Sequence, residues 1–77
     1  MVAQHVFYLR GETVQSVVER HHVRLAEVAE SLRISRSYWS QLCHRHRALT
    51  PVVRRRILQS RFFKGIPESD LWDVQLR

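Results

Sequence analysis

The segment 25–42 carries two apolar patterns, each of which predicts a short helix, with a turn between them. The first repeats at the i, i+3, i+4, i+7 spacing of one helix face and consists of Leu25, Val28, Ala29 and Leu32. Ser35 has the side-chain oxygen that caps a new helix, and Trp39 and Leu42 then resume an apolar stripe. The small side chain of Ala29 allows the second helix to cross the first closely. Two such helices share one small core and leave the outer face of the second exposed.

The length of the chain fits a single small domain. Helical domains of roughly 55–65 residues fold alone, so 77 residues suffice. We therefore expect one domain over residues 1–77, with the two-helix unit at 25–44 and an arm or strand at 1–11. The apolar block Val6–Leu9 permits a short strand there, and a first helical turn is the alternative.

Positive charge is concentrated in one window of the sequence. The formal net charge is +6, and no acidic residue occurs between Glu30 and Glu68. The basic residues in that window are Arg33, Arg36, Arg45, Arg47, Arg54, Arg55, Arg56, Arg61 and Lys64. A polyanion is the natural partner of such a surface, because each neutralised phosphate releases condensed counterions. A solvated arginine-rich face without a ligand is the alternative.

A further helix is predicted ahead of the two-helix unit, and a loop behind it. The helix begins at Glu12–Thr13, buries the valines of one face, and ends at His21–Val23. The residues 44–48 are polar and basic, and we expect them to form the loop.

Two more helices are expected in the last third of the chain. Thr50 can cap a helix that begins at Pro51, where proline loses no hydrogen bond, and Gly65 suits its end. Its expected buried residues are Val53, Ile57, Leu58 and Phe62. Its expected solvated residues are Arg54, Arg55, Arg56 and Lys64. A short helix is predicted over residues 68–72, with its acids near the N-terminus, where the helix dipole favours them.

Several of these strings resemble a known family. Ile34–Leu42 is similar to the turn and recognition helix of the lambda-repressor-like, Cro-type and xenobiotic-response-element-type helix-turn-helix family. Leu49–Pro51 with its basic helix, and the acidic closing segment Ile66–Trp72, are similar to later elements of that family. The resemblance covers roughly residues 13–72. It implies an all-α domain of four to five helices, with room for a short N-terminal strand, that binds DNA through the second helix of the motif.

The chain departs from the family pattern at specific positions. The turn position that usually holds glycine is Arg33, and the position that usually holds a small aliphatic residue in the recognition helix is Trp39. The loop Cys43–Ala48 is more basic than its family counterpart. A left-handed residue with a Cβ costs on the order of 1 kcal/mol, which a domain tolerates. The tryptophan must either enlarge the core or tilt the recognition helix.

The resemblance places one polar face of the recognition helix against the bases. The expected base-contacting residues are Arg36, Ser37, Ser40, Gln41 and His44. The expected phosphate-contacting residues are Arg33, Ser35, Tyr38, Arg45 and Arg47. Their chemistry is compatible with this placement, because arginine binds guanine and glutamine binds adenine through paired hydrogen bonds. Ser35 is expected to act as a helix cap first.

Metal binding and catalysis find little support in the sequence. The pair His21–His22 and the cluster Cys43–His46 lack the paired cysteines of structural zinc sites. No glycine-rich phosphate loop and no nucleophile–base set is visible, so we expect neither an enzyme nor a cofactor. Cys43 is expected to be a small, partly buried residue. As a lone cysteine it cannot form an internal disulfide, which favours a reducing compartment.

The sequence and the resemblance together predict a small sequence-specific regulator of transcription. The resemblance alone implies that it is a Cro-like repressor of a phage or mobile element, or a DNA-binding antitoxin. We expect it in the cytoplasm, bound to the nucleoid, with double-stranded DNA as partner and no membrane contact. Apolar residues in Val6–Leu9 and Phe62–Phe63, and Trp72, exceed what a small core needs and suggest a homodimer. Pairing of the N-terminal strand with its copy is one route, packing of the terminal helices is another, and a monomer with a few exposed apolar side chains is the alternative. The alternatives are a scaffold that inhibits a nucleic-acid enzyme such as RNA polymerase, one that binds a cognate toxin, or a DNA-bending accessory factor.

Overall fold

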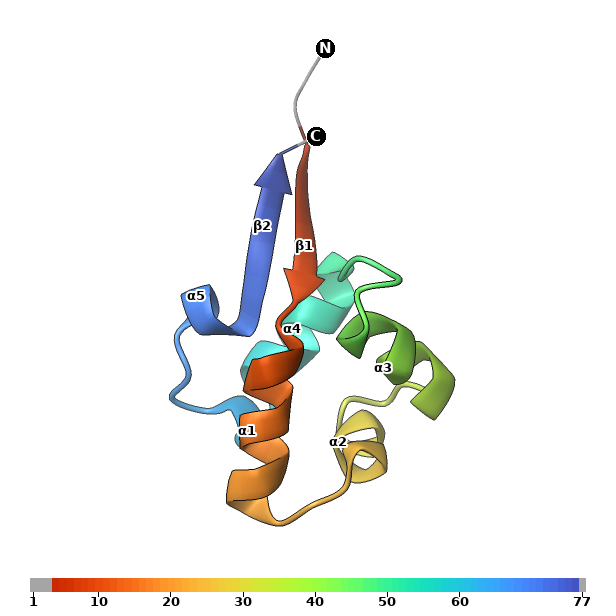
Figure 1. The fold of residues 1–77 in the computed structure, drawn as a ribbon, viewed down its shortest axis with the longest axis vertical. Coiled ribbons are helices and arrows are strands. Elements are labelled where there is room, and N and C mark those ends of the chain that lie inside the picture. The colour runs from red at the N-terminus through yellow and green to blue at the C-terminus, as the bar shows by residue number, and fades with distance from the viewer. Residues whose placement is uncertain (1–3, 77) are drawn as a thin grey trace.

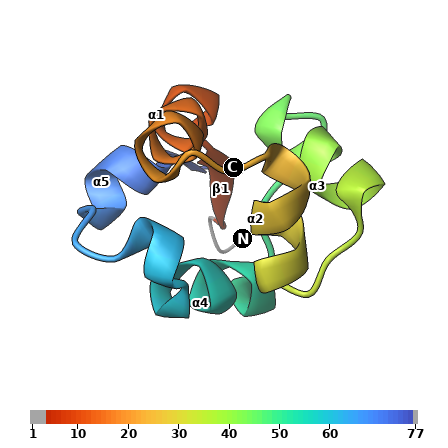
Figure 2. The ribbon, with the colours of Figure 1, turned by 90° about the horizontal axis from the view of Figure 1, so that it is seen from below.

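The computed structural model describes residues 4–76 and is mostly helical, with one small antiparallel sheet. In chain order the elements are β1 (His5–Leu9), α1 (Gly11–His21), α2 (Leu25–Ser31), α3 (Arg36–Cys43), α4 (Pro51–Gln59), a 3₁₀ turn η1 (Arg61–Phe63), α5 (Glu68–Leu71) and β2 (Trp72–Leu76). The helices surround a common core, and the two strands project from it as a narrow ribbon (Figure 1, Figure 2). Residues 1–3 of the predicted N-terminal arm lie outside the described residues, and 5–9 of it form β1 as a strand.

α2 and α3 form as the apolar spacing predicts. They lie side by side and are joined by the short turn 32–35 (Figure 1, Figure 2). The hydroxyl of Ser35 accepts a hydrogen bond from the backbone N–H of Tyr38 at 3.1 Å, so the predicted cap is confirmed. Arg33 adopts the left-handed conformation, with φ of 60°, that glycine takes in the family pattern.

The core is built from one side of every helix and from the base of the ribbon. Its buried residues are Leu9, Val14, Val17, Val28, Ala29, Leu32, Trp39, Leu42, Leu49, Val53, Ile57, Phe62, Phe63, Leu71 and Trp72. Trp39 is only 2% exposed, so the tryptophan enlarges the core. The expectation that Phe62 and Trp72 are core members is confirmed.

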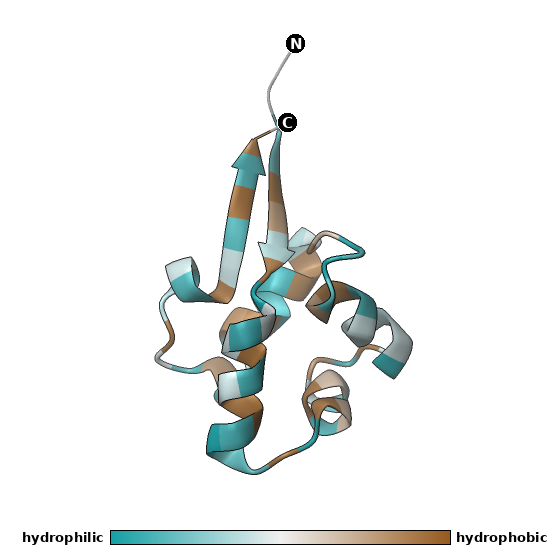
Figure 3. Ribbon diagram, in the orientation of Figure 1, coloured by the Kyte–Doolittle hydropathy of each residue, from teal (hydrophilic) through white to brown (hydrophobic). Residues whose placement is uncertain are grey.

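The sheet ties the two ends of the described chain together. β1 and β2 pair antiparallel, with Phe7 opposite Val74 and Leu9 opposite Trp72. The rings of Phe7 and Trp72 meet edge to face at 6.2 Å between centroids, a favourable arrangement for aromatic neighbours. Apolar and polar residues alternate along β2, as the bands in Figure 3 show. Of the two alternatives for residues 6–9, the strand is the one observed, whereas β2 was not predicted.

The fourth helix is shorter than expected, and its faces are assigned differently. α4 ends at Gln59, because Ser60 is extended and its hydroxyl caps η1 by accepting from the N–H of Phe62 at 3.3 Å. Phe62 and Phe63 of η1 are both buried, at 7% and 2% exposure, where η1 contacts α1. The expected burial of Leu58 is wrong, since this side chain is 47% exposed.

The expectation that all the arginines of α4 are solvated is also wrong. The guanidinium of Arg54 stacks on the ring of Phe7, with its central carbon 3.6 Å from the ring centroid. Arg56 is partly buried and donates hydrogen bonds to the turn after α2. Arg55 alone of the three is exposed, so α4 offers less free positive charge than its sequence suggests.

Candidate nucleic-acid interface

α3 presents a polar face that is held rigidly from behind. Trp39 and Leu42 are buried on its inner side. The exposed residues on the other side include Arg36, Ser37, Ser40 and His44, all expected to contact bases. Because the inner side chains lock the rotation of this short helix, the outer side chains share one fixed surface. The structure therefore brings four of the five expected base-contacting residues together on a single exposed face.

Gln41, the fifth of these residues, is half-buried and paired with an expected phosphate-contacting residue. The Nε of Arg47 donates a hydrogen bond to the Oε1 of Gln41. This bond uses one lone pair of the amide oxygen and leaves both amide N–H groups as donors. A glutamine held in this way keeps the donor and the acceptor capacity that adenine recognition requires.

The basic loop after α3 is anchored to the ribbon through Arg45. Its Nη1 lies 2.9 Å from Oδ2 of Asp73, and its guanidinium stacks over Tyr8 at 5.3 Å from the ring centroid. The other oxygen of the Asp73 carboxylate binds Nε of Arg10 at 2.9 Å. One carboxylate of β2 thus joins the loop to the residue that follows β1. Its pairing reduces the positive charge that Arg45 offers to a phosphate.

The remaining expected phosphate contacts occupy different surroundings. Arg33 is exposed in the turn before α3, at the N-terminal end of that helix. Ser35 uses its hydroxyl as the cap, so only its other lone pair and its proton remain for a ligand. Tyr38 packs partly against the core. Among these side chains, Arg33 has the freest position for a phosphate.

Asp73 gives stability a dependence on acidity. The hydrogen bond from Arg10, supported by the charge of Arg10 and the bond from Arg45, holds the pKa of Asp73 below its usual 3.8. A lowered pKa means that the folded state favours the ionised carboxylate. The stabilisation is therefore complete above pH 3.8 and disappears as the pH falls through the folded-state pKa.

We expect Asp73→Asn to be less stable than the parent chain at neutral pH, and the difference to vanish in strong acid. Urea unfolding of both proteins, at pH 7 and in steps below pH 4, measures it. Glu30→Gln is the matched control, because Glu30 is an exposed carboxylate in α2 and its loss should leave the pH dependence unchanged. A constant gap between Asp73→Asn and the parent across the whole range would contradict the assignment.

Arg56 supports the turn that positions α3, a role that the sequence analysis did not find. Its Nη1 donates to the backbone oxygens of Leu32 and Arg33, at 3.3 and 3.4 Å. These carbonyls follow the last turn of α2, where helix geometry leaves oxygens without partners. Arg56 lies 24 residues after Leu32 in the sequence, so no local pattern predicts this hydrogen bond. The fold alone brings the guanidinium close to the two carbonyls.

Replacement of Arg56 by methionine keeps most of the aliphatic stem and removes the hydrogen bonds. We expect a loss of about 1 kcal/mol in the free energy of unfolding, because the bonds are long and only partly buried. Arg55→Met is the control, since the neighbouring arginine is exposed. Urea denaturation measures both, and equal stabilities of the two variants would rule out the supporting role of Arg56.

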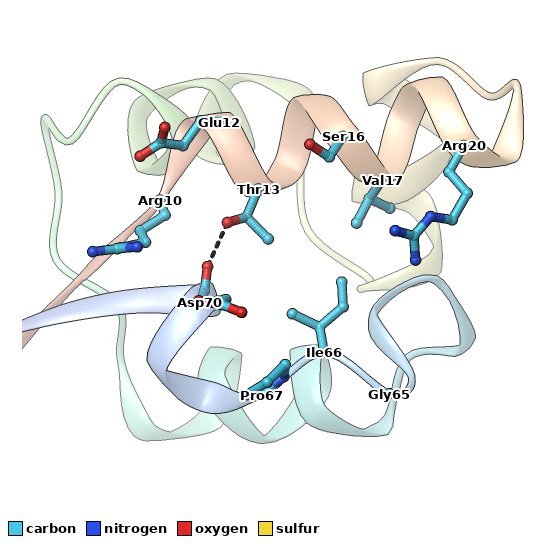
Figure 4. Close-up of a pocket in the computed structure, with 10 residues that line it drawn as sticks. All are labelled: Arg10, Glu12, Thr13, Ser16, Val17, Arg20, Gly65, Ile66, Pro67 and Asp70. Atoms are coloured by element: carbon cyan, nitrogen blue, oxygen red, sulfur yellow. Dashed lines mark hydrogen bonds between the residues drawn. The ribbon is translucent and has the colours of Figure 1, made fainter.

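One cavity lies away from α3. It holds about 480 Å³ between α1 and the segment 65–70, and Thr13 closes one side by donating a hydrogen bond to the backbone oxygen of Asp70 (Figure 4). The residues around it include the cations Arg10 and Arg20 and the carboxylate of Glu12. Its lining includes the hydroxyls of Thr13 and Ser16, and that of Thr13 is engaged in this hydrogen bond.

The cysteine and histidines near α3 do not gather into a metal-binding group. The rings of His44 and His46 are 6.1 Å apart between centroids, and residues 4–76 contain no cluster of three or more metal-ligating side chains. Burial raises the pKa of the Cys43 thiol to about 11, so the thiolate is scarce at neutral pH. The thiol therefore behaves as a small apolar group at the edge of the core, as predicted.

Comparisons of the chain with protein-family models, with curated proteins and with solved structures found no match. Within residues 4–76, no helix has the length and apolar character needed to cross a membrane.

Proposed function

We propose that this chain is a sequence-specific, double-stranded DNA-binding regulator of transcription. In this proposal α2 and α3 form a helix-turn-helix of the lambda-repressor-like kind, and α3 enters the major groove. The observation that carries it is the rigid, exposed polar face of α3, backed by the buried Trp39 and Leu42. Arginine, glutamine, serine and histidine on one helix face supply the hydrogen bonds that base edges accept and donate.

The charge distribution supports the same partner. No acidic residue occurs between Glu30 and Glu68, a window that contains the turn before α3, α3 itself and the basic loop. Arg33, Arg36 and Arg47 remain as cations around the polar face, even with Arg45 paired to Asp73. Such a regulator resembles the small Cro-like repressors of phages, mobile elements or antitoxins. It would act in the cytoplasm by occupying an operator on the nucleoid.

The proposal includes a homodimer. Its interface lies along β2 and not along the N-terminal strand β1. The N-terminal strand β1 pairs with β2 along one edge, and its residue Phe7 bridges to Leu49 on the other. β2 has no further strand beside it within the described residues, and its exposed side chains Val74 and Leu76 are apolar. An open strand edge with apolar side chains is a template for pairing, so we place the second copy along β2.

Sedimentation equilibrium tests the dimer. Val74→Lys should shift the protein to monomer at concentrations where the parent chain is dimeric, because a charge on the edge opposes strand pairing. Val52→Lys, which places the same charge on an exposed position of α4, should leave the association unchanged. A monomeric parent chain, or equal association of both variants, would contradict the β2 interface.

The function itself is tested by selection from a random pool of short DNA duplexes at physiological salt, followed by sequencing of the bound fraction. An enriched inverted repeat, with half-sites about one helical turn apart, would support a dimeric sequence reader. Binding without an enriched motif, lost steeply as salt rises, would mean that the basic face acts only by electrostatics. That result would favour the alternative of a scaffold that binds a protein such as a polymerase.

A further inference from the structure

An apolar pocket lies between the beginning of α2 and one side of α3. It holds about 140 Å³, and the residues that line it are Leu25, Ala26, Arg36, Trp39, Ser40, Cys43 and His44. Leu25 is 45% exposed, so this apolar side chain is open to a ligand at the rim of the pocket. Because burial keeps the thiol of Cys43 protonated, this side chain adds a neutral, polarisable wall.

The pocket borders the surface proposed to read DNA. Its polar members Arg36, Ser40 and His44 follow one another at intervals of four residues, so they form a single line along α3. All three are exposed. The same three side chains therefore line both the pocket and the candidate base-reading face. Leu25 and Ala26 bring an apolar wall to that line from a different helix.

The charge around the pocket favours a polyanion over a neutral partner. Arg36 is a member of the lining, and Arg33, in the turn between α2 and α3, is exposed nearby in the chain. The nearest acidic residue in sequence, Glu27, is exposed and does not line the pocket. A nucleic acid can supply both an apolar group for the pocket and negatively charged phosphates for the arginines beside it.

We propose that this pocket receives the C5 methyl group of a thymine, so that Leu25 and Ala26 take part in base choice from outside the recognition helix. The inference rests on the proposed function. The thymine methyl is the apolar group that the four standard bases display in the major groove, and it lies beside the polar atoms that Arg36 and Ser40 can bind. A methyl group enters a pocket of this size without displacing the buried Trp39.

The test replaces single thymines by deoxyuridine in the duplex that the selection experiment yields. This exchange removes only the methyl group and keeps every hydrogen bond of the base. At one thymine of each half-site, we expect the affinity of the parent chain to fall about three- to fivefold, the effect of burying one methyl group. Fluorescence anisotropy with labelled duplexes measures the dissociation constants.

Two variants locate the effect in the pocket. Ala26→Leu fills the space, and Leu25→Ser makes its wall polar at a site that is already half exposed. Both should bind the thymine and deoxyuridine duplexes equally at the sensitive position. Val52→Leu, at an exposed apolar position of α4, is the matched control and should keep the discrimination of the parent chain. If Ala26→Leu does not unfold cooperatively, the result of Leu25→Ser decides.

The outcomes separate this inference from the proposed function. Sequence-selective binding with no loss at any deoxyuridine, or a selected site without thymine, overturns the pocket assignment and leaves the regulator proposal intact. A deoxyuridine effect that persists in both variants overturns it as well, because the methyl contact then lies elsewhere. Absence of any selected sequence overturns both proposals. The occupant to examine would then be an apolar side chain of a protein partner.

Discussion

Trp39→Ala is expected to destabilise the domain by about 3–5 kcal/mol, the largest effect of any substitution considered for this chain. The side chain is 2% exposed and belongs to the core cluster, together with Leu42 of α3 and Val28 and Ala29 of α2. Its removal leaves a cavity that the surrounding helices cannot close. A domain of this size has a total stability of about 4–12 kcal/mol, so much of the molecule would unfold at moderate temperature.

Urea unfolding followed by fluorescence measures this loss, because the buried Trp72 remains as a reporter after Trp39 is removed. Trp39→Phe separates two contributions. The indole Nε1 has no hydrogen-bond partner among the described residues. The phenylalanine variant therefore loses side-chain volume in the core but no hydrogen bond. We expect it to cost markedly less than alanine. A Trp39→Ala variant as stable as the exposed-site control Val52→Ala would mean that α3 is not held from behind.

Most of the helical framework was predictable from the sequence because its signals are local. Ser35 and Thr50 carry capping oxygens, and the structure confirms both caps. The apolar spacing of α2 fixes which of its faces is buried, whatever the rest of the chain does. His22 ends α1 in the left-handed conformation, with φ of 54°, at the place where the histidine pair predicts an end. Local chemistry thus set the elements that present the candidate interface.

The features that the sequence did not reveal depend on contacts between distant segments. β2 is a strand because it pairs with β1. Its alternation of apolar and polar residues is too short to predict a strand when that pairing is unknown. α4 ends before Ser60, and Phe62 and Phe63 of the following turn are buried where η1 contacts the distant helix α1. Arg54 and Arg56 read as solvated charges on a helix face, yet each finds a partner more than twenty residues away.

The candidate site follows the same division. The outer face of α3 was predictable from helical spacing, and the structure brings its exposed members together. The side chains from other elements that contact the residues around that face were not predictable. Asp73 ties Arg45 to the sheet, and Leu25 forms a pocket with residues from the other helix. The sequence therefore indicated the candidate contact residues, while the fold decides which of them are exposed and which are held by other side chains.

Arg36→Ala is expected to weaken binding to the selected DNA site by roughly 1–3 kcal/mol and to relax the preference at one base pair. Arg36 is exposed at the first turn of α3, and a guanidinium there can bind O6 and N7 of guanine together. Alanine keeps the helix and removes both hydrogen bonds. Affinities for the preferred duplex and for its single-base variants, measured at one fixed salt concentration, report the loss at each position.

Arg55→Ala is the control for charge alone. Arg55 is exposed on α4, so its loss should weaken all sequences equally, or none, without changing their order. Arg54 is unsuitable for this purpose, because it stacks on Phe7 and its removal disturbs the base of the ribbon. If Arg36→Ala lowered every affinity by the same factor, its side chain would hold a phosphate and the base-reading surface would have to be shifted along α3. If selectivity and affinity both stayed unchanged, α3 would not be the helix that meets the bases.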